Sequence, residues 1–476
     1  MNKRLLKILI TILVSVCVLL EAMLPAYAEG SASVLDLTGM KGINAPPSID
    51  APSAILMEAN TGAILYAKDA YSPYHPASVT KVMTALLTLE NCSLDETVTF
   101  SYRATHELEE GASSIARTEG EELSVEECLY ALLVASANEV AQALAEHVGG
   151  SLEQFSQMMT ARAKELGCKD TYFANPSGLN DPAHHTTCFD MAMIMRKALQ
   201  DPTFVKIDST TSHVIPATNK HKEELGIAMK HKLLLKGDDH YEYAQCGKTG
   251  YTSIAGYNLV TTAKKGSMNL ICVVLGCKDS NSRYTSTKAL FDYGFKEFTL
   301  LNIAENDSDF KSNELLAADK SFLSGNLVAL SMPQNNYVIV PDGVDFSQLK
   351  NELVWRDDAS PGDEIATLVY RYRKVKVGEV RLTIAEGESS AYDFLRENTT
   401  LSAEIEKDEL ENPEKPTEAA PIQEKAGGPL LIAIIVLLSL LVLLLIILII
   451  LKLRQDGRRK KRRSKHTRRS YHSSRF

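Results

Sequence analysis

The sequence predicts a mixed α/β (α+β) domain, a small all-β sandwich after it, and a C-terminal transmembrane helix. Three observations support this order. Apolar residues at helical spacing alternate with short buried-strand patterns between about residues 48 and 295. Short apolar runs separated by Gly, Pro and Asp turns fill residues 296–400. One long apolar segment then follows near the C-terminus.

Residues 1–28 have the pattern of a signal peptide. Three basic residues precede the apolar stretch from Ile8 to Leu20, which is too short to span a membrane comfortably. The small residues of Ala26-Tyr27-Ala28 suit signal peptidase, so we expect cleavage after Ala28. An uncleaved N-terminal anchor is the alternative.

The first domain, residues 48–295, contains recognisable local signals. Asn60-Thr61-Gly62 separates two apolar runs and predicts a β-hairpin. Ser124 and Glu127 form a capping-box pattern before an apolar helix. Other segments are expected to form a helix after Ser78, buried strands at Leu259–Ala263 and Leu270–Leu275, and a helix at Thr285–Tyr293.

The β-sandwich predicted for residues 296–400 contains no chemical motif, so we interpret it as a spacer. Residues 401–429 lack apolar periodicity and predict a flexible stalk. Residues 430–451 form an apolar helix of about 33 Å at 1.5 Å per residue, long enough to span a bilayer.

The tail, residues 452–476, is strongly basic and directly follows the predicted span. The positive-inside rule places it in the cytoplasm and predicts that the chain crosses the cell membrane once, with its bulk outside. Nucleic-acid binding is the alternative for this basic run, but its position next to a span favours membrane orientation and contact with anionic lipids.

The net charge of −9 hides a segregation of charge. Of 51 Lys and Arg and 60 Asp and Glu residues, 15 basic and 2 acidic ones lie in the signal peptide and the tail, so the exported part carries about −22. This charge argues against nucleic acid as a partner.

The cysteines of the sequence show no metal-binding pattern. No Cys-x-x-Cys pair occurs, so we expect no metal site, and Cys246 is interpreted as a core residue of a strand.

The first of three short motifs is Ser78-Val79-Thr80-Lys81. A serine hydroxyl is a weak nucleophile that needs a base within hydrogen-bond reach. Residues i and i+3 share one face of a helix, so Ser78 and Lys81 meet if a helix starts there, as the preceding Pro76 suggests. Burial and a second cation, Lys248, would lower the pKa of Lys81 and make it a base.

The second motif is Ser136-Ala137-Asn138, which follows an apolar helical run. We expect the Ser136 hydroxyl to relay a proton to a leaving amine, and the Asn138 amide to hold the lysine and the substrate backbone. A polar loop between helices is the alternative interpretation.

The third motif, Lys248-Thr249-Gly250, is expected to form a strand edge beside the nucleophile. Lys248 and Thr249 suit a substrate carboxylate, and Gly250 permits close approach of the backbone. The main-chain N–H groups of Ser78 and Tyr251 are candidates for an oxyanion hole.

These motifs, in this order, resemble those of the D-alanyl-D-alanine carboxypeptidases, which are low-molecular-mass penicillin-binding proteins. The similar segments are His75–Thr84, Phe173–Leu179, Thr186–Ala192 and Lys248–Val260. The resemblance extends over about residues 48–390 and implies a penicillin-binding, transpeptidase-like catalytic domain.

The resemblance also implies a reaction. Ser78 would attack the penultimate D-Ala carbonyl of peptidoglycan stem peptides and release the terminal D-Ala, and water would then hydrolyse the acyl-enzyme. β-Lactams would acylate the same serine, and no cofactor is needed. The family usually has Ser-Gly-Asn followed by Asp, whereas Ala137 and Glu139 occur here, and the methyl of Ala137 is expected to tighten the turn. His231 occupies a departing segment and is left out of the predicted site.

Three functions are alternatives to a carboxypeptidase. A β-lactamase is disfavoured because no Glu-x-x-Asn occurs between Asn138 and Lys248. A DD-endopeptidase would use the same site on a different substrate. A catalytically weak cell-wall-binding or sensor protein is suggested by the span and tail, but it would not need the intact pair of Ser78 and Lys81.

Overall fold

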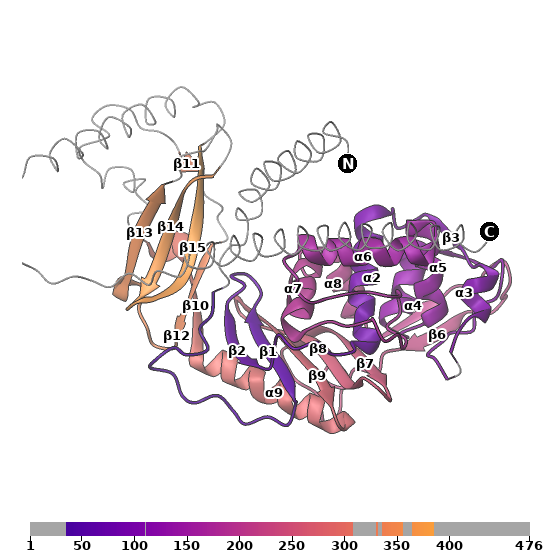
Figure 1. Ribbon diagram of the computed structural model, residues 1–476, viewed down its shortest axis with the longest axis horizontal. Helices are drawn as coiled ribbons and strands as arrows, with labels where there is room; N and C mark the ends of the chain where they lie inside the picture. Colours follow the sequence, from indigo (N-terminus) through magenta and orange to yellow (C-terminus); the bar gives the residue numbers. More distant parts are fainter. Residues whose placement is uncertain (1–34, 110, 308–329, 332–335, 356–363, 385–476) are drawn as a thin grey trace, which may run out of the picture. The chain divides into compact units, whose positions relative to one another are not determined.

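The computed structural model describes residues 35–109, 111–307, 330–331, 336–355 and 364–384 (Figure 1). The predicted signal peptide, stalk, transmembrane helix and basic tail lie outside these residues. In the part of the chain that is described, no helix combines the length and the apolar character needed to cross a membrane.

A five-stranded antiparallel sheet forms the centre of the first domain, in the order β2-β1-β9-β8-β7. Its strands are β1 (Ser53–Glu58), β2 (Ile64–Lys68), β7 (Ala244–Thr252), β8 (Gly256–Lys265) and β9 (Met268–Cys277). The β1–β2 pairing confirms the hairpin predicted around Asn60-Thr61-Gly62, and β8 and β9 confirm the two predicted buried strands. Strand β7, which carries the third motif, lies at one edge of the sheet.

Both faces of this sheet are covered, which explains why the central strands β1 and β9 are almost continuously apolar. Ile55 and Met57 of β1 pack into one hydrophobic core, whereas Ala54 and Leu56 pack into the other. This division follows from the alternation of side chains along a strand. Helix α9 (Ser280–Glu297) contacts one face, and α7 (Cys188–Ala198) contacts the other, on the side where the remaining helices of this domain lie (Figure 1). Helix α9 contains the predicted Thr285–Tyr293 helix and is longer than expected.

A helical layer surrounds α2 (Lys81–Asn91), whose residues from Lys81 to Thr88 are all buried. Helix α2 contacts several neighbours, which explains why its polar residues as well as its apolar ones lose contact with solvent. The other helices of this layer are α3 (Tyr102–His106), α4 (Val125–Leu133), α5 (Asn138–Gly149), α6 (Leu152–Glu165) and α8 (Pro202–Asp208). This domain also contains two small antiparallel two-stranded sheets, formed by β3 (Thr97–Thr99) with β4 (Glu122–Ser124) and by β5 (Ser212–Ile215) with β6 (Leu225–Ala228).

The capping box predicted at the start of α4 is only half formed. The Ser124 hydroxyl accepts a hydrogen bond from the main-chain N–H of Glu127, as expected for an N-cap. The Glu127 carboxylate instead contacts His213 Nε2 at 2.8 Å. In a complete capping box, the Glu127 carboxylate would accept a hydrogen bond from the Ser124 main-chain N–H. Here it contacts His213 of β5 instead.

A small β-rich region follows the first domain. It contains β10 (Phe298–Asn302) paired with β12 (Tyr337–Pro341), and a four-stranded sheet in the order β11-β15-β14-β13. These strands are β11 (Leu330–Ser331), β13 (Leu349–Trp355), β14 (Glu364–Tyr372) and β15 (Val375–Ile384). The apolar runs of the sequence at Tyr337–Val340, Ile365–Tyr370 and Glu379–Ile384 fall in β12, β14 and β15. Strand β13 has no such run, because Lys350 and Glu352 interrupt its apolar residues.

Candidate active site

Ser78 and Lys81 meet at the junction of two helical segments. Pro76 is the N-cap of the 3-10 turn η2 (Ala77–Thr80), and Lys81 is the first residue of α2. The Nζ of Lys81 lies 3.0 Å from the Oγ of Ser78. The predicted helix therefore starts with a tighter turn, and this turn still places residues i and i+3 on one side.

The Lys81 amine is fully buried and has three oxygen neighbours. Besides Ser78, it donates to the Oδ1 of Asn138 at 2.7 Å and to the carbonyl oxygen of Ser177 at 2.8 Å. Burial lowers the pKa of Lys81 well below its usual value, Lys248 lowers it further, and Glu139 opposes the shift. A neutral amine has two N–H groups and one lone pair. Because the two carbonyl oxygens can only accept, the lone pair is left for the Ser78 hydroxyl.

Asn138 begins α5 and is oriented by a neighbouring loop. Its Nδ2 donates to the carbonyl oxygen of Ser113 at 2.9 Å, and its main-chain N–H donates to the same oxygen at 2.8 Å. Since that carbonyl can only accept, the amide nitrogen must face Ser113 and the amide oxygen must face Lys81. Ser136, two residues earlier, is half-buried and has a φ of +61°. This strained backbone at a serine is typical of a functional turn.

The two departures in the second motif have structural explanations. Ala137 has a φ of −63° and is fully buried, so its methyl fits an ordinary backbone conformation. Glu139 is buried, and its Oε1 accepts hydrogen bonds from the Ser114 hydroxyl at 2.8 Å and from the Ile115 main-chain N–H at 2.6 Å. Glu139 thereby holds the loop whose carbonyl oxygen, on Ser113, orients the Asn138 amide.

Strand β7 brings the third motif against the turn that carries Ser78. A Cβ added at Gly250 would lie 2.8 Å from the Pro76 carbonyl oxygen and 3.1 Å from the Ser78 main-chain nitrogen. Only glycine allows this approach. Thr249 is half-buried beside it, and Tyr251 is exposed. The predicted residues of all three motifs are therefore brought together.

Lys248 has a different electrostatic environment from Lys81. It is buried, and burial lowers its pKa to about 8, with Asp208 raising it and Arg283 and Lys230 lowering it. Burial also raises the pKa of Asp208 to about 6, while Lys248 lowers it. Lys248 is therefore mainly protonated at neutral pH, as a carboxylate-binding group requires.

Sequence reasoning missed the partners that hold the nucleophile segment. The Asn258 amide donates to the carbonyl oxygens of His75 and Pro76, each at 2.8 Å. Its oxygen accepts from the Gly276 main-chain N–H at 2.8 Å. The sequence signal for this role is an amide side chain, Asn258, directly before the apolar residues of the predicted strand at Leu259–Ala263, where a buried polar group needs hydrogen-bond partners.

The segment from Asn175 to Leu179, for which the sequence analysis gives only a family resemblance, supplies a hydrogen-bond acceptor to Lys81. The Asn175 Oδ1 accepts from the main-chain N–H groups of Ser177 and Gly178, which shapes an Asx-type turn. Gly178 has a φ of +83°, and a Cβ there would lie 1.9 Å from the Ala77 carbonyl oxygen. This close approach brings the Ser177 carbonyl oxygen to Lys81.

A buried histidine connects the same segment to the turn of Ser78. The main-chain N–H of Ala174 donates to His184 Nδ1 at 3.1 Å, so Nε2 carries the proton and donates to the Thr80 hydroxyl at 2.9 Å. Burial lowers the pKa of His184 to about 3, which keeps it neutral.

His231, which we left out of the predicted site, lies beside it. It lines a small pocket together with Ser136, Lys248 and Thr249. Its Nε2 contacts the Thr261 hydroxyl at 2.8 Å, and burial lowers its pKa to about 3. The ring therefore acts as a neutral wall of the pocket. Cys246 is buried in the core as predicted.

Comparisons with known proteins agree with this geometry. Residues 40–279 match the D-alanyl-D-alanine carboxypeptidase family Peptidase S11. The chain is 32% identical over 340 residues to D-alanyl-D-alanine carboxypeptidase DacF of Bacillus subtilis, covering 70% of this chain and 83% of that protein.

Two solved structures extend the similarity. Penicillin binding protein 5 from Haemophilus influenzae has a TM-score of 0.57 and 26% identity, covering 72% of this chain and 98% of that chain. Penicillin binding protein 6B from Escherichia coli has a TM-score of 0.55 and 25% identity, covering 73% and 99%. This chain therefore belongs to the D-alanyl-D-alanine carboxypeptidase family of penicillin-binding serine peptidases, which confirms the family and the carboxypeptidase activity that the three motifs predicted.

Proposed function

We propose that Ser78 is the nucleophile and Lys81 the base of a serine-type carboxypeptidase that removes the terminal D-alanine from peptidoglycan stem peptides. The observation that carries this assignment is the arrangement around the Lys81 amine. Two carbonyl oxygens, of Asn138 and Ser177, take its two N–H groups and leave its lone pair for the Ser78 hydroxyl 3.0 Å away.

In the first step, Ser78 Oγ attacks the carbonyl carbon of the penultimate D-Ala, and its proton passes to Lys81 Nζ. The carbonyl oxygen becomes an oxyanion, for which the main-chain N–H groups of Ser78 and Tyr251 are the proposed donors. The close contact between Gly250 and the Ser78 nitrogen supports this assignment, because it brings these two backbone segments together. One such donor commonly contributes about 2.7–4 kcal/mol of transition-state stabilisation.

In the collapse of this intermediate, the peptide C–N bond breaks and the leaving amine takes a proton. We assign this proton relay to the Ser136 hydroxyl, which lines the pocket with Lys248. Asn138 holds Lys81 in place and faces the substrate backbone. Water then attacks the ester on Ser78, its proton passes to the base, and the shortened peptide leaves.

Lys248 and Thr249 are the proposed partners of the terminal carboxylate of the substrate. Lys248 is cationic at neutral pH, and the carboxylate of a terminal D-Ala matches its charge. A β-lactam also presents a carboxylate beside a reactive carbonyl, so these antibiotics are expected to acylate Ser78 by the same contacts.

The remaining assignments concern the position of the enzyme at the cell surface. We propose that residues 1–28 direct export and that residues 430–451 anchor the chain by one span, with residues 452–476 in the cytoplasm. The β-rich region of residues 296–400 is proposed to form a sandwich that acts as a spacer. It would hold the catalytic domain of residues 48–295 away from the membrane, on the side where peptidoglycan lies.

The test is covalent labelling with a fluorescent penicillin, followed by incubation with a pentapeptide muropeptide. The full-length protein should be labelled and should release free D-Ala, and Ser78→Ala should do neither. Thr105→Ala, at an exposed hydroxyl of α3, is a control that should keep both activities. Loss of labelling in the unmodified protein would contradict the assignment of Ser78. Labelling without release of D-Ala would favour a DD-endopeptidase or a sensor.

A further inference from the structure

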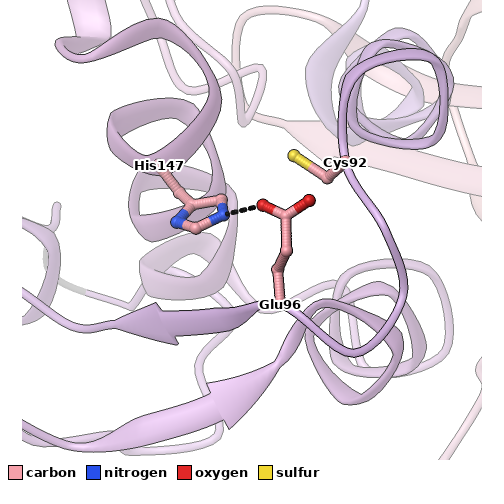
Figure 2. A group of neighbouring side chains, drawn as sticks. All are labelled: Cys92, Glu96 and His147. Atoms are coloured by element: carbon pink, nitrogen blue, oxygen red, sulfur yellow. Dashed lines mark hydrogen bonds and ion pairs between the residues drawn. The ribbon is translucent and has the colours of Figure 1, made fainter.

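Three side chains outside the active site point toward one another (Figure 2). Cys92 follows the last residue of α2, Glu96 precedes β3, and His147 lies in the last turn of α5. A sulfur, a carboxylate oxygen and an imidazole nitrogen from these residues all lie within 4.8 Å of one another. Among the described residues, no other group of three or more such side chains converges in this way.

The absence of a Cys-x-x-Cys pair led us to expect no metal site, but this cluster joins ligands from two separate parts of the chain, and we propose that Cys92, Glu96 and His147 bind one divalent transition-metal ion. Thiolate, imidazole and carboxylate are the ligands that zinc takes in proteins, so Zn²⁺ is the ion that this set favours. Metal–ligand bonds of about 2.0–2.3 Å place the atoms of a tetrahedral site roughly 3.4–3.6 Å apart. The His147 Nε2 and Glu96 Oε2 atoms are already 3.0 Å apart, so modest side-chain rotation forms the site, and water takes the fourth position.

The loop that carries two of the ligands is already ordered around this position. Glu96 Oε1 accepts a hydrogen bond from the Ser93 main-chain N–H at 2.6 Å, which turns Oε2 toward His147. The carbonyl oxygens of Leu94 and Glu96 accept from the first N–H groups of α4, at 3.0 and 2.9 Å. The ion would therefore not have to order a flexible segment.

The local electrostatics favour a cation. Helix α2 ends at Asn91, directly before Cys92, and α5 ends at Gly149, two residues after His147. The C-terminal end of a helix carries partial negative charge, and neither helix has a Lys or Arg in its last turn. A metal ion at this position would supply the missing positive charge to both helices.

The location connects this site to the catalytic residues. The same two helices begin with Lys81 and Asn138, whose side chains are 2.7 Å apart. A metal ion bound near the C-terminal ends of α2 and α5 would form a second link between these helices. This link would lie about 16 Å along the helices from the contact between Lys81 and Asn138. Metal binding should therefore stabilise the helical layer that holds the base.

The first experiment measures metal content. The full-length protein in detergent is stripped with a chelator, equilibrated with Zn²⁺ and desalted, and it should retain one equivalent. Cys92→Ser, Glu96→Gln and His147→Gln should each lose most of this zinc. The control is His106→Gln, which removes a histidine from α3 that lies outside the cluster. Saturating Zn²⁺ should raise the Tm of the unmodified protein by about 5 °C or more, and that of the three variants little.

The second experiment uses only the unmodified protein, so its result does not depend on whether a variant folds. Co²⁺ bound to the unmodified protein should give a thiolate-to-cobalt charge-transfer band, and alkylation of the half-buried Cys92 thiol beforehand should abolish it. Penicillin labelling of each variant checks its fold and the active site separately from metal binding. The proposal is overturned if the unmodified protein retains no zinc, if all three variants keep the full equivalent, or if the cobalt protein lacks the thiolate band.

Discussion

The Nζ of Lys81 lies 2.7 Å from the Oδ1 of Asn138, at the start of a different helix. The Ser113 carbonyl oxygen fixes which end of the Asn138 amide faces the lysine. Because a carbonyl oxygen accepts but cannot donate, this contact directs the hydrogens of the amine away from Ser78. The geometry thus provides a lysine whose lone pair is available, while burial disfavours its charged form.

Asn138→Asp should shift the pH dependence of acylation toward higher pH. A carboxylate at this position favours the protonated form of Lys81 and raises its pKa. It also replaces the amide N–H that donates to Ser113 by an oxygen, which adds a repulsive contact. At neutral pH, the rate of labelling by a fluorescent penicillin should fall roughly 10-fold or more, and part of it should return as the pH rises.

Asn138→Ala is the matched variant for this experiment. It removes the contact to Lys81 without adding charge, so the rate should fall at all pH values with no shift of the profile toward higher pH. If Asn138→Asp and Asn138→Ala gave profiles of the same shape, the proposed control of the Lys81 charge by residue 138 would be wrong.

The kcat/KM of the carboxypeptidase reaction should have a bell-shaped pH profile, with an acid limb and an alkaline limb. As the proposed base, Lys81 must be unprotonated, so kcat/KM should rise as the pH increases through its lowered pKa. As the proposed partner of the substrate carboxylate, Lys248 must be protonated, so kcat/KM should fall again above about pH 8. Steady-state kinetics of D-Ala release measure both limbs.

Lys248→Arg distinguishes the two groups. A guanidinium keeps its charge throughout the accessible range, so the alkaline limb should disappear or move far upward, while the acid limb stays in place. An alkaline limb unchanged in this variant would show that another group than Lys248 controls substrate binding.

Asp208→Asn should move the alkaline limb toward lower pH. The buried Asp208 carboxylate raises the pKa of Lys248, and the neutral amide removes this effect. The loss of activity at alkaline pH should therefore begin earlier, without loss of the maximal rate. Asp238→Asn, at an exposed carboxylate, is the control and should leave the profile unchanged. A profile in which only the acid limb moved would contradict the assignment.

Gly250→Ala should reduce both stability and acylation. The added methyl would meet the Pro76 carbonyl oxygen at 2.8 Å, so β7 and the turn carrying Ser78 must separate. We expect a loss of roughly 1–3 kcal/mol in the free energy of unfolding, and slower penicillin labelling. Urea unfolding and labelling kinetics measure the two effects. Gly226→Ala on β6 has no atom within 4 Å of the added Cβ and should show neither.

Much of the fold was predictable because its signals are local. The β1–β2 hairpin, the buried strands β8 and β9 and the N-cap at Ser124 follow from turn residues, apolar runs and capping chemistry. The predictions failed where a residue or strand distant in the sequence determines the local structure. Glu127 contacts His213 instead of completing the capping box, and β13 forms by pairing with β14 although its own sequence is half polar.

For the site, the sequence by itself identified the proposed reacting groups, a serine and a lysine three residues apart and a strand motif whose glycine allows contact. It also predicted that the Asn138 amide holds the lysine. Only the tertiary structure decided the second acceptor of the Lys81 amine, the carbonyl oxygen of Ser177, which is 96 residues away along the chain. Every residue has a main-chain carbonyl, so no sequence pattern marks the one that the fold brings to the lysine.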